Sequence, residues 1–228
     1  MNKRHLKNAL YEQVALLGSA LSNPKRLELL DLLAQSEKTV EALAAEIDAD
    51  VKLISAHLKA LKAAHLVSAR RDGKYMVYRL TGTDVSMLWA LLREVAQAHV
   101  LELQQALQHL LHDASALAPL SRAELMAQAQ RGDVVVIDVR PSAEYLAAHL
   151  PFARSMPVAE LAQRLDELPK DKTIVAYCRG PFCLMADEAL ALLKAHGLQA
   201  QKCPDGVSEW LAAGLPLASL IAATSAVL

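Results

Sequence analysis

Two of the three cysteines lie at the ends of one short loop, which reads Cys178-Arg179-Gly180-Pro181-Phe182-Cys183. The loop follows the apolar run 174–177, and a helix is expected to begin at Leu184. A thiol at the end of a buried strand, facing loop amides and a helix start, is favoured as the thiolate, which predicts Cys178 as a nucleophile or redox centre. A disulfide or polysulfide bridge to Cys183 requires Cα atoms within roughly 7 Å. Two roles stay open for Cys183: a thiol that resolves the product of Cys178, or a residue that only completes the loop.

A second chemical feature is a dense group of cations in residues 52–79. Seven Lys or Arg side chains stand there against one acid, Asp72, for a local net charge of +6. The whole chain carries a formal net charge of −1. A strongly basic stretch in a nearly neutral protein indicates an anionic partner. The cations are Lys52, Lys59, Lys62, Arg70, Arg71, Lys74 and Arg79.

Helices and one hairpin are predicted to position these cations. Start signals and apolar spacing predict helices over 24–35, 39–44 and 51–64. Alternating runs on either side of Asp72-Gly73 predict a hairpin. Residues 84–112 predict one long amphipathic helix with more apolar surface than a small domain buries, which indicates a dimer interface.

After residue 120, strands and helices alternate, which predicts a parallel α/β sheet with functional loops at the carboxyl ends of its strands. The predicted helices cover 121–130, 142–147, 158–167, 184–196 and 206–213, and the predicted strands cover 134–139, 173–177 and 199–203. The small, Pro-bearing segment between the halves predicts a domain boundary. The expected organisation is a mainly α domain over 1–112, a linker over 113–120, an α/β domain over 121–217 and a tail over 218–228.

Composition excludes several classes of protein. The chain has 228 residues, 54% of them hydrophobic, which suffices for real cores and argues against a disordered or fibrous chain. Three cysteines are too few and odd in number for a secreted disulfide framework, so we expect a cytoplasmic protein. The start lacks the apolar region of a signal peptide. The uncharged stretch 210–228 contains Gly214 and Pro216, so we expect no membrane partner.

The first half resembles the ArsR family of transcriptional regulators over roughly residues 10–100. The likeness rests on 22–27 (SNPKRL), 54–67 (ISAHLKALKAAHLV) and the hairpin 70–80 (RRDGKYMVYRL). It implies a winged helix-turn-helix homodimer that places the 51–64 helix in the major groove of operator DNA and the wing against the backbone or minor groove. The family usually has Arg where this chain has Ala56, so base preference does not carry over. The expected DNA-binding residues are Lys52, Ser55, His57, Lys59, Arg70, Arg71 and Lys74.

Many ArsR relatives sense metals, but residues 39–50 contain no cysteine where the thiolate-type sensors carry a pair. His99, Glu102, His109 and His112 on the long helix are an alternative ligand set, although a His on a helix face more often packs or meets solvent. We therefore expect no metal and no cofactor.

The second half resembles the rhodanese family over about residues 118–217. The matching motifs are 138–145 (DVRPSAEY), 149–153 (HLPFA), 174–180 (IVAYCRG) and 205–216 (DGVSEWLAAGLP). The resemblance implies an α/β rhodanese-like domain in which Cys178 attacks a sulfane sulfur and holds it as a persulfide. Arg179 is expected to steer an anionic donor, with Asp138 and Arg140 in supporting positions. Cys203 fits a packing role.

The loop departs from the family pattern at its last position. The usual loop ends with Arg, whereas this one ends with Cys183, and Pro181 and Phe182 make it more apolar. Loss of the second Arg removes a cation for thiosulfate, which argues against efficient thiosulfate turnover.

These features together predict a cytoplasmic, homodimeric regulator that binds double-stranded operator DNA and responds to sulfane sulfur or redox state through Cys178. The expected sulfur donors are persulfide, polysulfide or thiosulfate. The alternative is a rhodanese-type sulfurtransferase with an accessory DNA-binding domain. A third reading, an arsenate-type reductase, is disfavoured because the position six residues after Cys178 is Leu184, which leaves no C-x5-R phosphate cradle.

Overall fold

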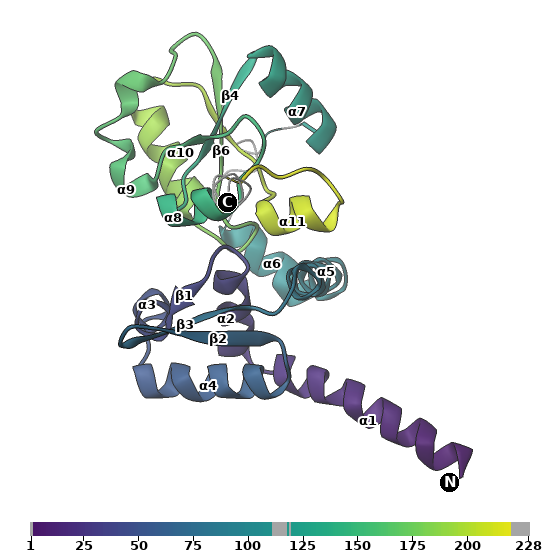
Figure 1. The fold of residues 1–228 in the computed structure, drawn as a ribbon. Helices are drawn as coiled ribbons and strands as arrows, with labels where there is room; N and C mark the ends of the chain where they lie inside the picture. Colours follow the sequence, from purple (N-terminus) through teal and green to yellow (C-terminus); the bar gives the residue numbers. More distant parts are fainter. Residues whose placement is uncertain (1, 111–117, 119, 220–228) are drawn as a thin grey trace, which may run out of the picture. The chain divides into compact units, whose positions relative to one another are not determined.

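A computed structural model describes residues 2–110, 118 and 120–219. The chain divides into two compact units, residues 1–89 and 90–228 (Figure 1). Most of the expected linker, 113–120, and most of the expected tail, 218–228, lie outside the described residues. Within the described part of the chain, no helix is long and apolar enough to cross a membrane.

The first unit packs short helices against a small antiparallel sheet. Its core includes the fully buried Leu29, Leu43 and Ile54, each from a different helix. Side-chain caps fix the helix starts where the sequence predicts them: the Asn23 side chain accepts from the Arg26 N–H, and that of Asp50 from the Lys52 N–H. The elements are α1 (Lys3–Leu21), α2 (Pro24–Leu33), β1 (Lys38–Thr39), α3 (Val40–Ile47), α4 (Val51–Ala63), β2 (Val67–Asp72) and β3 (Tyr75–Leu80).

The predicted hairpin forms from β2 and β3, in a sheet of order β1-β3-β2. Asp72 pairs with Tyr75, so Gly73 and Lys74 make a two-residue turn. Gly73 has a φ of 58°, in the left-handed region that glycine tolerates best. Arg70 and Arg71 pair with Val77 and Met76, which sets the wing cations along one strand.

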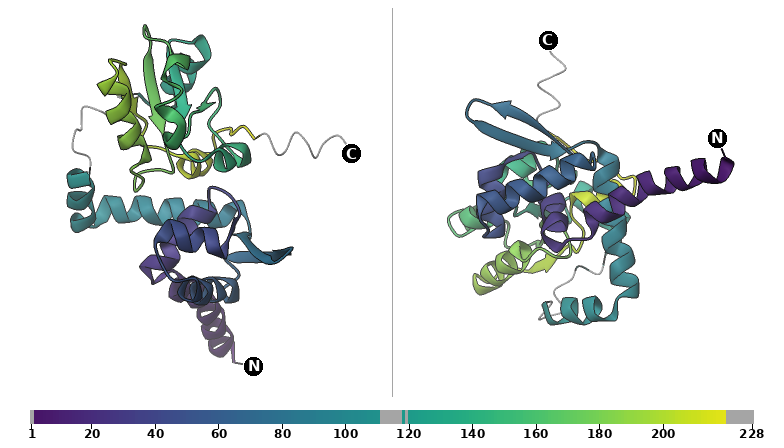
Figure 2. Two further views of the ribbon diagram at one scale, coloured as in Figure 1. Left: turned by 90° about the vertical axis from the view of Figure 1, so that its left-hand side faces the viewer. Right: turned by 90° about the horizontal axis from the view of Figure 1, so that it is seen from below.

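The prediction of one long helix over 84–112 is wrong. The structure has α5 (Thr83–His99) and α6 (Leu101–Leu110), and α6 leaves α5 at a sharp bend (Figure 2). The side-chain amide of Gln104 donates to the carbonyl oxygens of Gln97 and Ala98, at 2.7 and 3.1 Å. Those carbonyls would otherwise accept the next helical N–H groups, so an inserted side chain holds the bend.

The second unit contains a four-stranded sheet of order β5-β4-β6-β7 in which every pairing is parallel, as the alternation predicts. The prediction of a helix over 158–167 is wrong, because a single short turn and a 3-10 turn replace it. Besides α6, the helices are α7 (Arg122–Arg131), α8 (Ser142–Ala147), α9 (Val158–Leu161), η2 (Leu165–Glu167), α10 (Met185–Ala195) and α11 (Val207–Ala212). The strands are β4 (Val134–Asp138), β5 (Arg154–Ser155), β6 (Thr173–Tyr177) and β7 (Ala200–Lys202).

Both faces of this sheet are covered, which explains the continuous apolar runs of its central strands. On β6, Ile174 and Ala176 pack into a core with α9 and α10, whereas Val175 and Tyr177 pack into a second core with α7 and α11 (Figure 1). Trp210 of α11 is buried in the second core. Cys178 therefore begins its loop from a strand that is fixed on both sides.

Candidate functional site

The structure brings the two loop cysteines together at the carboxyl end of β6. Cys178 follows the strand directly and is 1% exposed, whereas Cys183 lies at the far end of the loop and is half-buried. The Cys178 thiol donates to the carbonyl oxygen of Cys183 at 3.5 Å, and the carbonyl oxygen of Gly180 lies 3.9 Å from the same sulfur. The Cys178 thiol thus lies against the backbone of Cys183. Two thiols joined at the ends of one loop in this way can form a disulfide or share a transferred sulfur atom.

Burial and the contact between the two loop cysteines shift the pKa values of their thiols in opposite directions. The hydrogen bond to Cys183, together with burial, raises the pKa of Cys178 well above its ordinary value. The same hydrogen bond, with help from the backbone N–H groups of Arg179 and Met185, lowers the pKa of Cys183 to about 7. Backbone N–H groups also reach Cys178, but burial outweighs them. In this dithiol state, contact with Cys183 and burial oppose the backbone N–H groups that reach Cys178, and its role as the reacting thiolate stays a prediction.

Arg179 is held by a carboxylate that the sequence reasoning did not assign to the site. Its Nε lies 3.1 and 3.0 Å from the two carboxylate oxygens of Glu144, and its terminal nitrogen completes an ion pair. The Glu144 side chain comes from α8 and is fully buried. The positive charge expected to steer an anionic donor is thus largely compensated. In the sequence, the glutamate of the motif DVRPSAEY could have identified this partner of Arg179.

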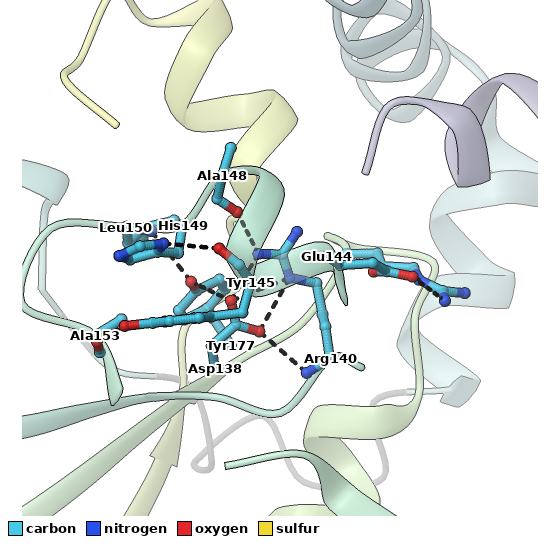
Figure 3. Close-up of polar contacts among 10 residues, drawn as sticks. Asp138, Arg140, Glu144, Tyr145, Ala148, His149, Leu150, Ala153 and Tyr177 are labelled. Carbon is cyan, nitrogen blue, oxygen red and sulfur yellow. Dashed lines mark hydrogen bonds and ion pairs between the residues drawn. The ribbon is translucent and has the colours of Figure 1, made fainter. Parts of the chain in front are cut away.

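Beneath the loop, a buried polar network joins β4 to β6 (Figure 3). The Tyr177 hydroxyl donates to Asp138 at 2.5 Å, and Arg140 forms an ion pair with the same carboxylate at 2.6 Å. Arg140 also donates to the Ala148 carbonyl at 2.7 Å, and the Leu150 N–H donates to the Tyr177 hydroxyl at 3.1 Å. Burial raises the pKa of Tyr177, as does the Asp138 charge, so its hydroxyl stays a donor. The network places Asp138 and Arg140 in positions that fix the residue immediately before Cys178.

Two residues from the β7–α11 region hold the loop from the other side. The Lys202 ammonium is buried and donates to Asp187 at 2.6 Å and to the Cys183 carbonyl at 3.4 Å. Gly206 lies so close to the loop that an added Cβ would stand 2.7 Å from the Cys178 carbonyl oxygen and 2.6 Å from the Arg179 carbonyl carbon. Only glycine allows this approach. Among the described residues, no group of three or more His, Cys, Asp or Glu could hold a metal ion.

In the first unit, the expected DNA-binding side chains fall on α4 and the wing, and those on α4 share one face with one exception. Lys52 and Lys59 are exposed and Ser55 is half-buried. At about 100° of rotation per residue, these three lie on one side of the helix. His57 lies about 140° around the axis from Lys52 and is half-buried beside the core-facing side, so the structure does not group it with the others. Ala56 stands near the centre of the exposed face.

The wing cations are exposed but have partners in the free protein. Arg70 forms ion pairs with Glu37 and Asp72 at 2.5 and 2.9 Å. Arg71 donates to the Gly73 carbonyl at 3.0 Å, and the Lys74 ammonium lies over the Tyr75 ring. Exposed pairs of this kind are weak and exchange readily for phosphate contacts.

Family models match both units of the chain, and one relative matches most of its length. The model for "Bacterial regulatory protein, arsR family" matches residues 23–69, and the model for "Rhodanese-like domain" matches residues 121–213. The HTH-type transcriptional regulator Rv0324 of Mycobacterium tuberculosis is 45% identical over 211 residues, covering 92% of each chain. The chain belongs to the arsR family of bacterial regulatory proteins.

Further relatives match one half of this arsR-family regulator. The "Sulfurtransferase" of Allochromatium vinosum is 31% identical over 86 residues, which is 37% of this chain and 78% of that protein. The solution structure of the homodimeric winged helix-turn-helix DNA-binding domain of Mb0332 from Mycobacterium bovis is 47% identical, with a TM-score of 0.41. It covers 44% of this chain and 91% of that domain. The protein is an arsR-family transcriptional regulator that carries a rhodanese-like domain.

Proposed function

We propose that this regulator binds operator DNA as a cytoplasmic homodimer and that sulfane sulfur or oxidation at the Cys178–Cys183 pair alters its DNA affinity. The observation that carries the sensing proposal is the contact between the two ends of the loop, in which the Cys178 thiol donates to the Cys183 carbonyl oxygen at 3.5 Å. Transfer of sulfur to this pair, or its oxidation, gives the loop a second covalent state. A second state that differs in DNA affinity is what a regulatory switch requires.

Several surfaces support the DNA-binding and dimer parts of the proposal. The helix α4 has the size of a helix that enters a major groove. Exposed cations on α4 and on the wing can contact the DNA phosphates: Lys52, Lys59, Arg71 and Lys74. The related Mb0332 domain is homodimeric. On this chain, α5 exposes a row of apolar side chains suited to covering by a second copy: Met87, Leu88, Leu91, Leu92 and Val95.

The loop electrostatics favour a donor with little charge. Because Glu144 compensates Arg179 and Cys183 replaces the usual terminal Arg, a dianion such as thiosulfate finds little net positive charge at the loop. Phe182 and Leu184 are exposed beside Cys183 and present apolar surface to an approaching donor. We therefore place persulfides and polysulfides ahead of thiosulfate as donors.

The direct test is a gel shift of the gene's upstream DNA before and after polysulfide treatment, with wild type and Cys178→Ser. The proposal expects a shift that changes on treatment in wild type and stays constant in the variant. Identical shifts for treated and untreated wild type would contradict it. Cys203→Ser is the matched control, since Cys203 is buried in the core on the other face of the sheet.

A sulfurtransferase enzyme is the second candidate function, favoured by the likeness of the α/β unit to the "Sulfurtransferase" of Allochromatium vinosum. Multiple turnovers with thiosulfate and cyanide, compared with glutathione persulfide, separate the two. Fast sustained turnover favours the enzyme. A single transfer that stops at one equivalent per chain favours the switch.

A further inference from the structure

We infer that α4 selects thymine bases in its operator through an apolar row on its exposed face, which meets the C5-methyl groups of thymine in the major groove. This inference rests on the proposed entry of α4 into the major groove and adds the base that the helix selects there. The side-chain types on α4, their positions around the helix axis and their exposure carry it.

The helix α4 lacks the side chains that most often read a base edge with two hydrogen bonds. Its sequence, VKLISAHLKALKA, contains no Arg, Asn or Gln. Arg commonly pairs in this way with guanine, and Asn or Gln with adenine. The fully exposed polar side chains of α4 are all lysines: Lys52, Lys59 and Lys62. Lysines also contact phosphates, which carry no sequence information, so base selection by α4 calls for another group.

Apolar and polar side chains lie in separate rows on the outer side of α4. The core-facing side is fixed by three fully buried residues: Ile54, Leu58 and Leu61. At about 100° of rotation per residue, Leu53, Ala56 and Ala60 follow one another at three- and four-residue steps and form the apolar row. A polar row lies beside it and consists of Ser55, Lys59 and Lys62. A helix in a groove can thus turn its polar row to one phosphate backbone and its apolar row to the base edges.

The first two turns of α4 leave the apolar row open to solvent. The helix lies at the edge of the first unit (Figure 1). Leu53 is 48% exposed, and Ala56 stands near the centre of the exposed face. The first turns of a recognition helix are the part that reaches base edges, and Ala is among the side chains that contact the thymine methyl. Such contact removes apolar surface of both partners from water, which favours thymine at the contacted positions.

The experiment replaces thymine by deoxyuridine, which lacks only the C5-methyl group. The full-length protein, kept reduced with dithiothreitol, first selects its binding site from randomised duplex DNA. Each thymine of that site is then replaced singly, and fluorescence anisotropy measures the Kd. Because burial of one methyl group changes affinity about fourfold, we expect that loss at the contacted thymines of a half-site. Replacement of the matched thymine in both half-sites should cost about sixteenfold.

Protein variants identify the side chain that meets each methyl group. In Leu53→Ala, deoxyuridine should cost less than about twofold at the thymine that Leu53 contacts, because the apolar partner is gone. Ala56→Gly should remove the cost at a different thymine. Lys59→Ala is the matched control on the polar row: binding weakens through lost phosphate contacts, but every deoxyuridine cost remains. Thermal unfolding checks that each variant folds.

The outcomes are distinguishable. Deoxyuridine costs that disappear in Leu53→Ala or Ala56→Gly and persist in Lys59→Ala support the inference. Deoxyuridine that is neutral at every position, or whose cost persists in both apolar variants or disappears equally in Lys59→Ala, overturns the inference and leaves operator binding intact. Selection that recovers no preferred sequence overturns both. If Ala56→Gly unfolds, Leu53→Ala decides alone, since alanine is the strongest helix former.

Discussion

The thiol of Cys178 donates to the carbonyl oxygen of Cys183 across 3.5 Å. The loop therefore binds its two ends together through one of the two thiols. Formation of a disulfide would remove the Cys178 S–H donor and leave Lys202 as the remaining side-chain donor that the structure places on that carbonyl, at 3.4 Å. Reaction of the pair thus changes the hydrogen bonding of the loop as well as its covalent state.

The pH dependence of alkylation follows from the lowered pKa of Cys183. Its pKa of about 7 lies below the ordinary thiol value, so the thiolate is present above pH 7 and is lost as pH falls through 7. We expect the alkylation rate of Cys183, measured by peptide-resolved mass spectrometry, to rise with a midpoint near pH 7. Cys203 is the internal control, because burial raises its pKa to about 12 and it should stay unlabelled at pH 7. A Cys183 midpoint above pH 8.5 would be inconsistent with this geometry.

Gly206→Ala tests the close approach of the α11 start to the loop. Its Cβ would stand 2.6 Å from a backbone carbon of Arg179, and backbone moves less easily than a side chain. We expect the free energy of unfolding in urea to fall by about 1–3 kcal/mol. Gly18→Ala is the control, since nothing lies within 4 Å of its Cβ position and alanine favours a helix. Equal stability of the two variants would show that the loop can shift away from the added Cβ without loss of stability.

Glu144→Gln tests whether the buried carboxylate compensates Arg179. Removing the charge leaves the guanidinium, only 14% exposed, without its counter-ion. We expect the free energy of unfolding to fall by about 3 kcal/mol and thiosulfate turnover to rise, because Arg179 becomes available to anions. Glu160→Gln, at an exposed ion pair with Arg164, should change neither property. Unchanged stability of Glu144→Gln would refute the assigned pairing.

The DNA interface is tested by contrasting two residues of α4. Lys59→Ala removes an exposed cation from each protomer of the dimer, so operator affinity should fall and the slope of log affinity against log salt should decrease by about 2. His57→Ala should leave the slope unchanged, because His57 lies beside the core-facing side of the helix. Fluorescence anisotropy across a salt series measures both. A larger slope change for His57→Ala than for Lys59→Ala would place DNA on another face.

Leu91→Glu tests the apolar face of α5. Leu91 is 55% exposed, and a charge there opposes burial against a second copy. We expect analytical ultracentrifugation to find monomers where wild type is dimeric, with weaker operator binding. Leu146→Glu, on α8 and 42% exposed, is the control and should stay dimeric. A dimeric Leu91→Glu protein would exclude this face as the interface.

Sequence reasoning reached the two-unit architecture because its signals are local and strong. Asp50 caps its helix, Asp72-Gly73 closes its hairpin, and the run ending at Tyr177 forms a central parallel strand. The helix over 84–112 was mispredicted because the apolar period continues through the bend. The side chain of Gln104, four residues beyond the break, donates to the freed carbonyls. The spacing of apolar residues does not indicate such a contact.

At the loop, sequence reasoning found the two cysteines but not their surroundings. Spacing placed Cys178 after a buried strand, but the direction of its S–H and the depth of its burial are tertiary properties. Arg179 pairs with Glu144, and the Cys183 carbonyl accepts from Lys202. Both partners lie on other elements of the fold. Gly206 is 28 residues from Cys178 in sequence, and only the packed structure reveals that they touch.

The central claim, that the state of the cysteine pair sets DNA affinity, is tested most directly by anisotropy titrations of operator DNA with reduced and polysulfide-treated protein. The account predicts a change in Kd on the order of tenfold for wild type, reversed by dithiothreitol and absent in Cys178→Ser and Cys183→Ser. An unchanged Kd for wild type in which mass spectrometry finds the Cys178–Cys183 bridge fully formed would contradict it.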